Sequence, residues 1–181
     1  MKSLQLEKPH AIVMVGIQGS GKSFFARKFS DTFNAPFIEQ NALAAHAIDT
    51  GATDALVKLM LEQVLKTRHS IVIEVDTATK ASRLQLMKQL KDAGYTPLFV
   101  WVQVDVETAK VRSMKQAGVT AELYDAELKR FTPPSAAERP LVISGKHTYA
   151  TQARIILKKL SAPRASAPQR PGPARGQIIV R

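Results

Sequence analysis

The stretch that decides the fold is "GIQGSGKS", residues 16–23, which follows directly on the apolar run "AIVMV" of residues 11–15. Three of the chain's nine glycines lie within these eight residues. The stretch meets the phosphate-loop pattern G-x-x-x-x-G-K-[ST] in full. The residues that meet it are Gly16, Gly21, Lys22 and Ser23. Such a loop binds phosphate when it lies between a buried strand and a helix. Here the apolar run precedes it, and residues 22–33 after it have the apolar spacing of an amphipathic helix.

This loop is expected to hold a nucleoside triphosphate. Glycines let successive backbone N–H groups turn toward one phosphate, and the N-terminal end of the following helix attracts its negative charge. Lys22 is expected to contact the β- and γ-phosphates, and the Ser23 hydroxyl to bind Mg²⁺. No N-K-x-D stretch for guanine occurs, which favours ATP over GTP. The predicted nucleotide contacts are Gly16, Ile17, Gln18, Gly19, Ser20, Gly21, Lys22, Ser23 and Phe24.

The rest of the chain alternates short apolar strands with amphipathic helices, which predicts an α/β domain with a parallel sheet. The strand candidates are residues 10–15, 35–39, 70–75, 96–104 and 141–144. A short helix over residues 41–48 is expected to be capped by Asn41. The predicted domain covers residues 1–160. Residues 161–181 carry four prolines and no acid, and predict a basic tail.

Composition limits the partners and the compartment. The 181 residues carry 26 Lys and Arg against 15 Asp and Glu, a net charge of +11 that fits a nucleic-acid partner as well as a phosphate-handling enzyme. The absence of cysteine excludes disulfides and thiolate metal sites. No apolar run approaches the ~20 residues of a membrane helix, and no secretory signal is visible. We therefore expect a cytoplasmic protein; its oligomeric state is not predicted.

An acid at the end of another strand, the predicted strand over residues 70–75, is expected to share the Mg²⁺ ion with Ser23. In "SIVIEVD", Asp76 lies just beyond an apolar run, at the strand end where open α/β sheets bind their ligands. Asp76 is therefore the predicted metal-binding aspartate, and capping of the following helix is its alternative role. Glu74 lies two residues earlier, on the same side of the strand. It fits a structural acid as well as a catalytic one.

Together with the phosphate loop, further motifs resemble a family. They are Asp76-Thr77-Ala78-Thr79 followed by Arg83, Arg112 in "AKVRSMK", and the aromatic-Pro-Glu pattern of "RFTPPSAAERPLVI". Over residues 10–160 the chain resembles the small P-loop kinases related to the polynucleotide kinase domain and the zeta toxins, with an ATP-binding domain of the AAA type. The resemblance implies a five-stranded parallel sheet with a helical lid.

The resemblance also assigns roles to basic side chains. Arg112 matches the first lid arginine, which contacts ATP and neutralises charge in phosphoryl transfer. The second lid position falls at Lys115, and Arg130 is a weaker phosphate candidate. Arg83 is expected to contact either substrate or solvent.

One departure from the family concerns the catalytic base. Members carry an aspartate after the second strand, often as D-x-x-R, to orient or deprotonate the acceptor hydroxyl. Here Asn41 and Ala44 stand at those positions, and asparagine cannot take a proton. Either Glu39 or Asp49 does this work, or there is no base.

Three functions remain open from the sequence. The first is an ATP-dependent kinase that transfers the γ-phosphate to a hydroxyl on a nucleic-acid end, a nucleotide or a small molecule. The second is an ATP-binding switch or slow ATPase that acts through a partner, which the missing aspartate favours. The third is an ATP-dependent nucleic-acid-binding protein, although few aromatic residues are present to stack on bases.

Overall fold

The computed structural model describes residues 6, 8–116 and 118–162, and its centre is a parallel sheet of five strands in the order β2-β3-β1-β4-β5. The strands are β1 (His10–Val15), β2 (Phe37–Glu39), β3 (Ile71–Glu74), β4 (Thr96–Gln103) and β5 (Leu141–Ser144). The central strand β1 pairs with β3 and with β4, and its last five residues are buried. A strand that is buried on both faces reads as a continuous apolar run, as "AIVMV" does.

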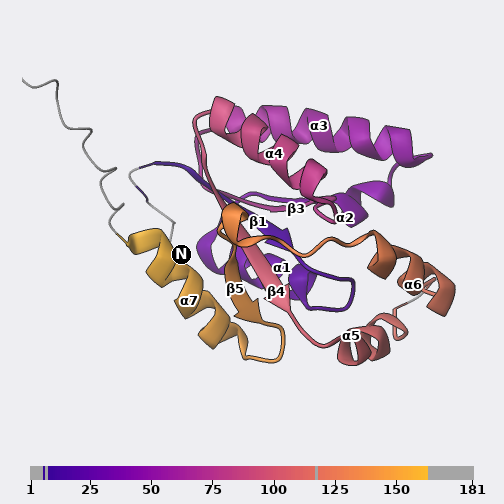
Figure 1. Ribbon diagram of the computed structural model, residues 1–181. Coiled ribbons are helices and arrows are strands. Elements are labelled where there is room, and N and C mark those ends of the chain that lie inside the picture. The colour runs from indigo at the N-terminus through magenta and orange to yellow at the C-terminus, as the bar shows by residue number, and fades with distance from the viewer. Residues whose placement is uncertain (1–5, 7, 117, 163–181) are drawn as a thin grey trace, which may run out of the picture.

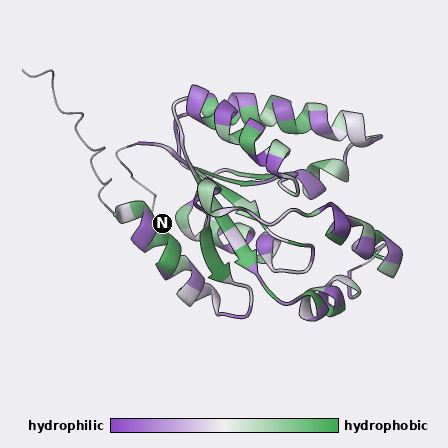
Figure 2. Cartoon of the chain, viewed as in Figure 1, coloured by the Kyte–Doolittle hydropathy of each residue, from purple (hydrophilic) through white to green (hydrophobic). Residues whose placement is uncertain are grey.

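Helices cover both faces of this sheet (Figure 1). The helices are α1 (Lys22–Phe33), α2 (Gln40–Ala44), α3 (Thr50–Lys66), α4 (Lys80–Asp92), α5 (Val106–Ser113), α6 (Ala121–Arg130) and α7 (Tyr149–Ser161), with a 3₁₀ turn η1 at Ala136–Glu138. On one face, Ile12 and Met14 pack in one core cluster with α1 and α7. On the other, Val13 packs in a second cluster with α3 and α4. Figure 2 shows the hydrophobic strands between helices of mixed polarity.

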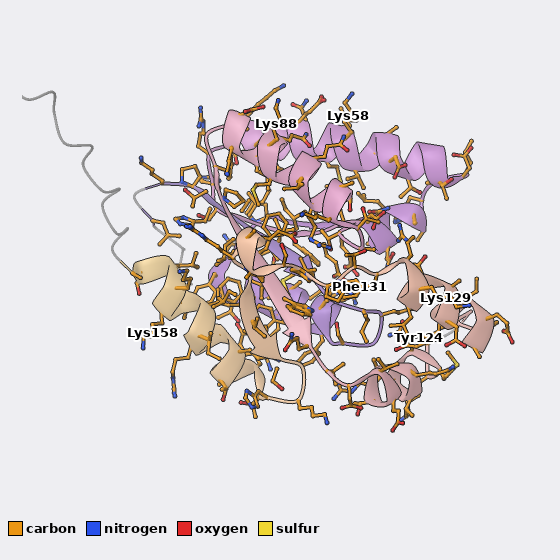
Figure 3. All side chains as sticks on the ribbon, viewed as in Figure 1. Lys58, Lys88, Tyr124, Lys129, Phe131 and Lys158 are labelled. Carbon is orange, nitrogen blue, oxygen red and sulfur yellow. The ribbon has the colours of Figure 1, made fainter. Side chains whose placement is uncertain are left out.

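Helices α5 and α6 lie beyond the carboxyl end of the sheet and cover neither face (Figure 1). They hold one another through Tyr124, whose hydroxyl donates to the carbonyl of Val106 at 3.1 Å, and through the ion pair of Lys110 with Asp125 at 2.8 Å. Phe131 follows α6 and packs against the core cluster under α3 and α4; both aromatic residues are labelled in Figure 3. These two helices form the helical lid that the resemblance implies.

The predicted α/β architecture is confirmed, with one local correction. The cap of α2 is not Asn41: the helix begins at Gln40, and Glu39 precedes it without a side-chain cap. The predicted tail, residues 161–181, lies outside the described residues from 163 onward. None of the helices in the described part of the chain is long and apolar enough to cross a membrane.

Candidate active site

The loop between β1 and α1 has the backbone conformation that its glycines predict. Gly16, Gly19 and Gly21 have φ angles of +145°, +78° and +103°, which other residues rarely adopt. Gly21 is the N-cap of α1 and offers no side-chain cap, so the first N–H groups of this helix remain for a ligand. The loop and the helix end together form an anion-binding site.

Gly16 and Gly19 are also required by close packing, whereas a Cβ on Gly21 would meet no atom within 4 Å. A Cβ atom on Gly16 would lie 2.6 Å from the carbonyl oxygen of Val102. One on Gly19 would collide with the carbonyl oxygen of Ala109 and lie 2.6 Å from Ser113 Oγ. The phosphate loop is therefore seated directly on β4 and on the lid helix α5.

Lys22 is held at this loop in a half-buried position. Its Nζ donates to the carbonyl of Ile17 at 2.9 Å. Burial lowers the pKa of Lys22, and the negative charges of Glu74 and Glu127 oppose that shift. An ammonium group that lacks water gains strongly from a nearby anion, which is the role expected of the phosphate-loop lysine.

Glu74, at the end of β3, is the acid that meets Ser23. The Ser23 hydroxyl donates to Glu74 Oε1 at 2.8 Å, while the buried Oε2 has no hydrogen-bond partner among the described residues. Burial is the main cause that raises the pKa of Glu74; Lys22 and Ser23 counteract it. A buried carboxylate oxygen without a partner, beside a hydroxyl, matches the oxygen donors that Mg²⁺ prefers. The residues present therefore fit a magnesium ion.

Asp76 follows β3 and faces the lid. Its Oδ2 accepts from Arg130 Nη1 at 2.7 Å, and its Oδ1 accepts from the backbone N–H of Ala78 at 3.1 Å. Arg130 also pairs with Glu127 at 2.9 Å. The predicted alternative role of Asp76 as a helix cap is wrong, because the Thr79 side chain caps α4. Of the two acids of "SIVIEVD", the structure brings Glu74 to Ser23 and joins Asp76 to the end of α6.

The two candidate bases have different surroundings. Glu39, at the end of β2, lies in register with Glu74, and its side chain is 9% exposed. Arg27 of α1 donates to both of its carboxylate oxygens, at 2.9 and 2.5 Å. Asp49 is exposed and caps α3 by accepting from the N–H of Ala52 at 2.7 Å. Glu39 therefore lies at the end of β2, next to Glu74, the acid that Ser23 contacts. Asp49 instead stabilises the N-terminal end of α3.

Arg112 belongs to the lid helix α5, and Phe24 belongs to α1, the helix that follows the phosphate loop. Arg112 Nη1 donates to the carbonyl of Gly145 at 3.1 Å, and a Cβ on Gly145 would collide with the carbonyl oxygen of Ser20. This chain of contacts places Arg112 beside the phosphate loop. The Phe24 ring is 65% exposed on α1, with Lys28 Nζ 5.8 Å from its centre.

The expectation that Arg83 contacts substrate or solvent is wrong. Its side chain is 1% exposed and forms an ion pair with Glu138. Arg83 Nη1 donates to the carbonyls of Thr77 and Thr132, both at 2.9 Å, and to that of Ala78 at 3.2 Å. Arg83 therefore connects the loop after Asp76 to residues 132–138, the segment that follows α6. The sequence carries no signal for it, because the two charges stand 55 positions apart.

Comparison with known proteins assigns this loop and its surroundings to a family. A family model described as "AAA domain" matches residues 12–134, which include the phosphate loop, β3 and the lid. The chain belongs to this family. No curated protein matches the chain.

Solved structures share the fold at low identity. A gluconokinase from Sinorhizobium meliloti 1021 is 20% identical with a TM-score of 0.64, over 84% of this chain and 91% of that one. Kti12 from Chaetomium thermophilum, in complex with ADP-AlF3, is 16% identical with a TM-score of 0.62, over 82% and 96%. A chain of the Pnkp1/Rnl/Hen1 RNA repair complex is 18% identical with a TM-score of 0.59, over 70% and 45%. These similarities confirm the P-loop NTPase fold and the resemblance to P-loop kinases.

Proposed function

We propose that the chain is an ATP-dependent kinase that transfers the γ-phosphate to an acceptor hydroxyl. The observation that carries the proposal is the complete phosphate loop, in which the half-buried Lys22 donates to the carbonyl of Ile17 and Ser23 donates to the Glu74 carboxylate. The lid arginine Arg112 beside the same loop supports transfer over binding alone, because phosphoryl transfer develops charge that such a cation stabilises. The cytoplasm, where ATP is abundant, is the proposed compartment.

The nucleotide would be held by residues 16–24, with Lys22 at the phosphates and Arg112 on the lid side. Ser23 and Asp76 are the proposed holders of Mg²⁺ from the sequence, and Glu74, whose buried Oε2 lies free beside Ser23 among the described residues, is proposed as a further oxygen ligand. When bound, Mg²⁺ supplies positive charge that neutralises the β- and γ-phosphate oxygens. Asp76 is now paired with Arg130, so both side chains are candidates to change partners when the ion binds.

Glu39 is the proposed carboxylate for the acceptor hydroxyl. Arg27 orients it by donating to both oxygens, and each oxygen retains a lone pair that can accept from a hydroxyl. A loose phosphoryl-transfer transition state asks for orientation more than for a strong base. Asp49 is the alternative, which a variant tests.

The class of the acceptor is the open part of the proposal. One structural neighbour is named a gluconokinase and another belongs to an RNA repair complex, so sugar acids and RNA ends are both rational acceptors. The net charge of +11 adds support for a nucleic-acid partner. The second candidate function, an ATP-binding switch or slow ATPase, is favoured by Asn41 at the family's aspartate position.

The test uses γ-labelled ATP and Mg²⁺ with a panel of acceptors: gluconate, neutral sugars, nucleosides, and RNA and DNA with 5′-hydroxyl ends. The wild type is compared with Lys22→Ala. Label on one acceptor class, lost in Lys22→Ala, is the expected result. Release of free phosphate alone, or tight ATP binding with no turnover, would refute the kinase in favour of the switch. ATP binding that survives Lys22→Ala in a folded protein would refute the nucleotide site itself.

A further inference from the structure

The lid helix α5 approaches the phosphate loop closely at Gly19. A Cβ on Gly19 would collide with the Ala109 carbonyl oxygen and would lie 2.6 Å from Ser113 Oγ. Ala109 and Ser113 are one helical turn apart, so they face the loop side by side. Both are fully buried, at 0% exposure. Gly19, which has no side chain, and the small side chain of Ser113 therefore allow the loop to approach the Ala109 carbonyl this closely.

The Ser113 hydroxyl is not explained by hydrogen bonding. Its Oγ is buried and has no partner among the described residues. An unpaired buried hydroxyl destabilises a fold, so the hydroxyl itself is not what stability requires at this position. The small volume of the side chain is what the contact with Gly19 requires.

The same helical turn carries Arg112. Its guanidinium donates to the carbonyl of Gly145, in the loop after β5. That loop is fixed to the start of α5 by the ion pair of Lys146 with Asp105 at 2.6 Å. The position of Arg112 thus depends on how α5 sits on Gly19 at one side and on the Gly145 loop at the other.

We propose that Ala109 and Ser113 form a seat for the phosphate loop at Gly19, and that Ser113 is a positioning residue that sets Arg112 beside the nucleotide. The inference rests on the proposed function, in which Arg112 contacts ATP. A larger side chain at position 113 would lift the last turn of α5 from the loop and move Arg112 with it. Removal of the hydroxyl alone would leave the seat intact.

The experiment measures ATP binding by titration calorimetry with the full chain and Mg²⁺, independently of any acceptor. Ser113→Thr adds one methyl group, and Ser113→Ala is the matched control without the hydroxyl. Overpacking by one methyl predicts a Kd about tenfold higher for Ser113→Thr. For Ser113→Ala we expect a Kd within about twofold of the wild type and an equal or higher melting temperature.

A double-mutant cycle with Arg112→Ala tests whether the effect passes through Arg112. Ser113→Thr should then change the Kd of Arg112→Ala by less than about twofold, since coupled residues are not additive. An unchanged Kd in Ser113→Thr, a full effect in the Arg112→Ala background, or equal losses in Ser113→Ala and Ser113→Thr would each overturn the proposal.

Folding and the nucleotide site are controlled separately. Circular dichroism establishes that each variant is folded at the temperature of the titration. If Ser113→Thr does not fold, Ser113→Cys, whose sulfur is larger than the hydroxyl oxygen, replaces it in the same cycle and is expected to raise the Kd in the same direction. If ATP binding is insensitive to Lys22→Ala, the proposed nucleotide site is refuted. If ATP binding depends on Lys22 but the effects of Ser113→Thr and Arg112→Ala on the Kd are additive, only the positioning role of Ser113 is refuted.

Discussion

The buried ion pair between Arg83 and Glu138 should make the stability of this protein depend on pH in a way that Glu138→Gln removes. Arg83 Nε donates to Glu138 Oε2 at 2.6 Å, and the two side chains are 1% and 5% exposed. The hydrogen bond from Arg83 is the main cause that lowers the pKa of Glu138 from 4.5 to about 2. The N–H and hydroxyl of Ser135 also donate to this carboxylate and add to the shift.

The sign and size of the effect follow from the two pKa values. Because the folded protein holds the carboxylate ionised more strongly than the unfolded chain does, the contribution is complete above pH 4.5 and declines as the pH falls toward 2. A difference of 2.5 between 4.5 and about 2 corresponds to about 3 kcal/mol of unfolding free energy at pH 7. By about pH 3, roughly 2 kcal/mol of it should be lost.

The assay is urea denaturation of the wild type and of Glu138→Gln at pH 7 and near pH 3, followed by circular dichroism. The variant should be less stable at pH 7, and the gap should narrow by roughly 2 kcal/mol at the lower pH. Asp92→Asn is the matched control, because Asp92 pairs with Lys88 on the surface, at 65% and 80% exposure. That exposed pair should change stability by less than about 1 kcal/mol. A gap between wild type and Glu138→Gln that stays constant from pH 7 to pH 3 would refute the reasoning.

Three further outcomes follow from the site. Gly19→Ala should lower the melting temperature and abolish ATP binding, because the φ of +78° strains an alanine by about 1–3 kcal/mol and its Cβ meets α5; normal ATP binding would contradict the geometry of the loop. Asp76→Asn should reduce Mg²⁺-dependent turnover more than ATP binding, as measured by kinetics and calorimetry beside Glu74→Gln; equal losses would indicate a structural role. Asp49→Ala should cost about 1 kcal/mol in urea denaturation through loss of the α3 cap, and a larger fall in kcat than in Glu39→Gln would assign the base to Asp49 instead.

Much of the fold could be predicted because it is encoded locally. The bounds of β1, α1 and β5 agree with their predicted ranges to the residue. Buried parallel strands leave continuous apolar runs, and each following helix repeats its apolar residues with a helical period, so both signals lie within short windows. The phosphate loop was predictable for the same reason, since its conformation depends on glycines that are adjacent in sequence.

The contacts of the charged side chains could not be predicted, because they join distant segments. Arg83 stands at the start of an amphipathic helix, where an arginine is normally solvated, and only the return of the chain after α6 brings Glu138 over it. For Glu74 and Asp76, which are only two residues apart, the sequence likewise does not indicate which acid meets which partner. The strand period places them on one side, but β3 ends at Glu74, and the chain then turns Asp76 toward Arg130.

The register of the sheet explains why the acids nevertheless gather at one place. Parallel strands end at the same edge, and β2 pairs with β3 so that Glu39 lies opposite Glu74. The Ser23 hydroxyl reaches Glu74 from the first turn of α1, and Arg27 reaches Glu39 from the next turn of the same helix. One helix thus joins the phosphate loop to both carboxylates. A base at Glu39 would be held by α1, the same helix that begins at the phosphate loop. An aspartate at the position of Asn41 would lie in α2 instead, and α1 would not hold it in this way.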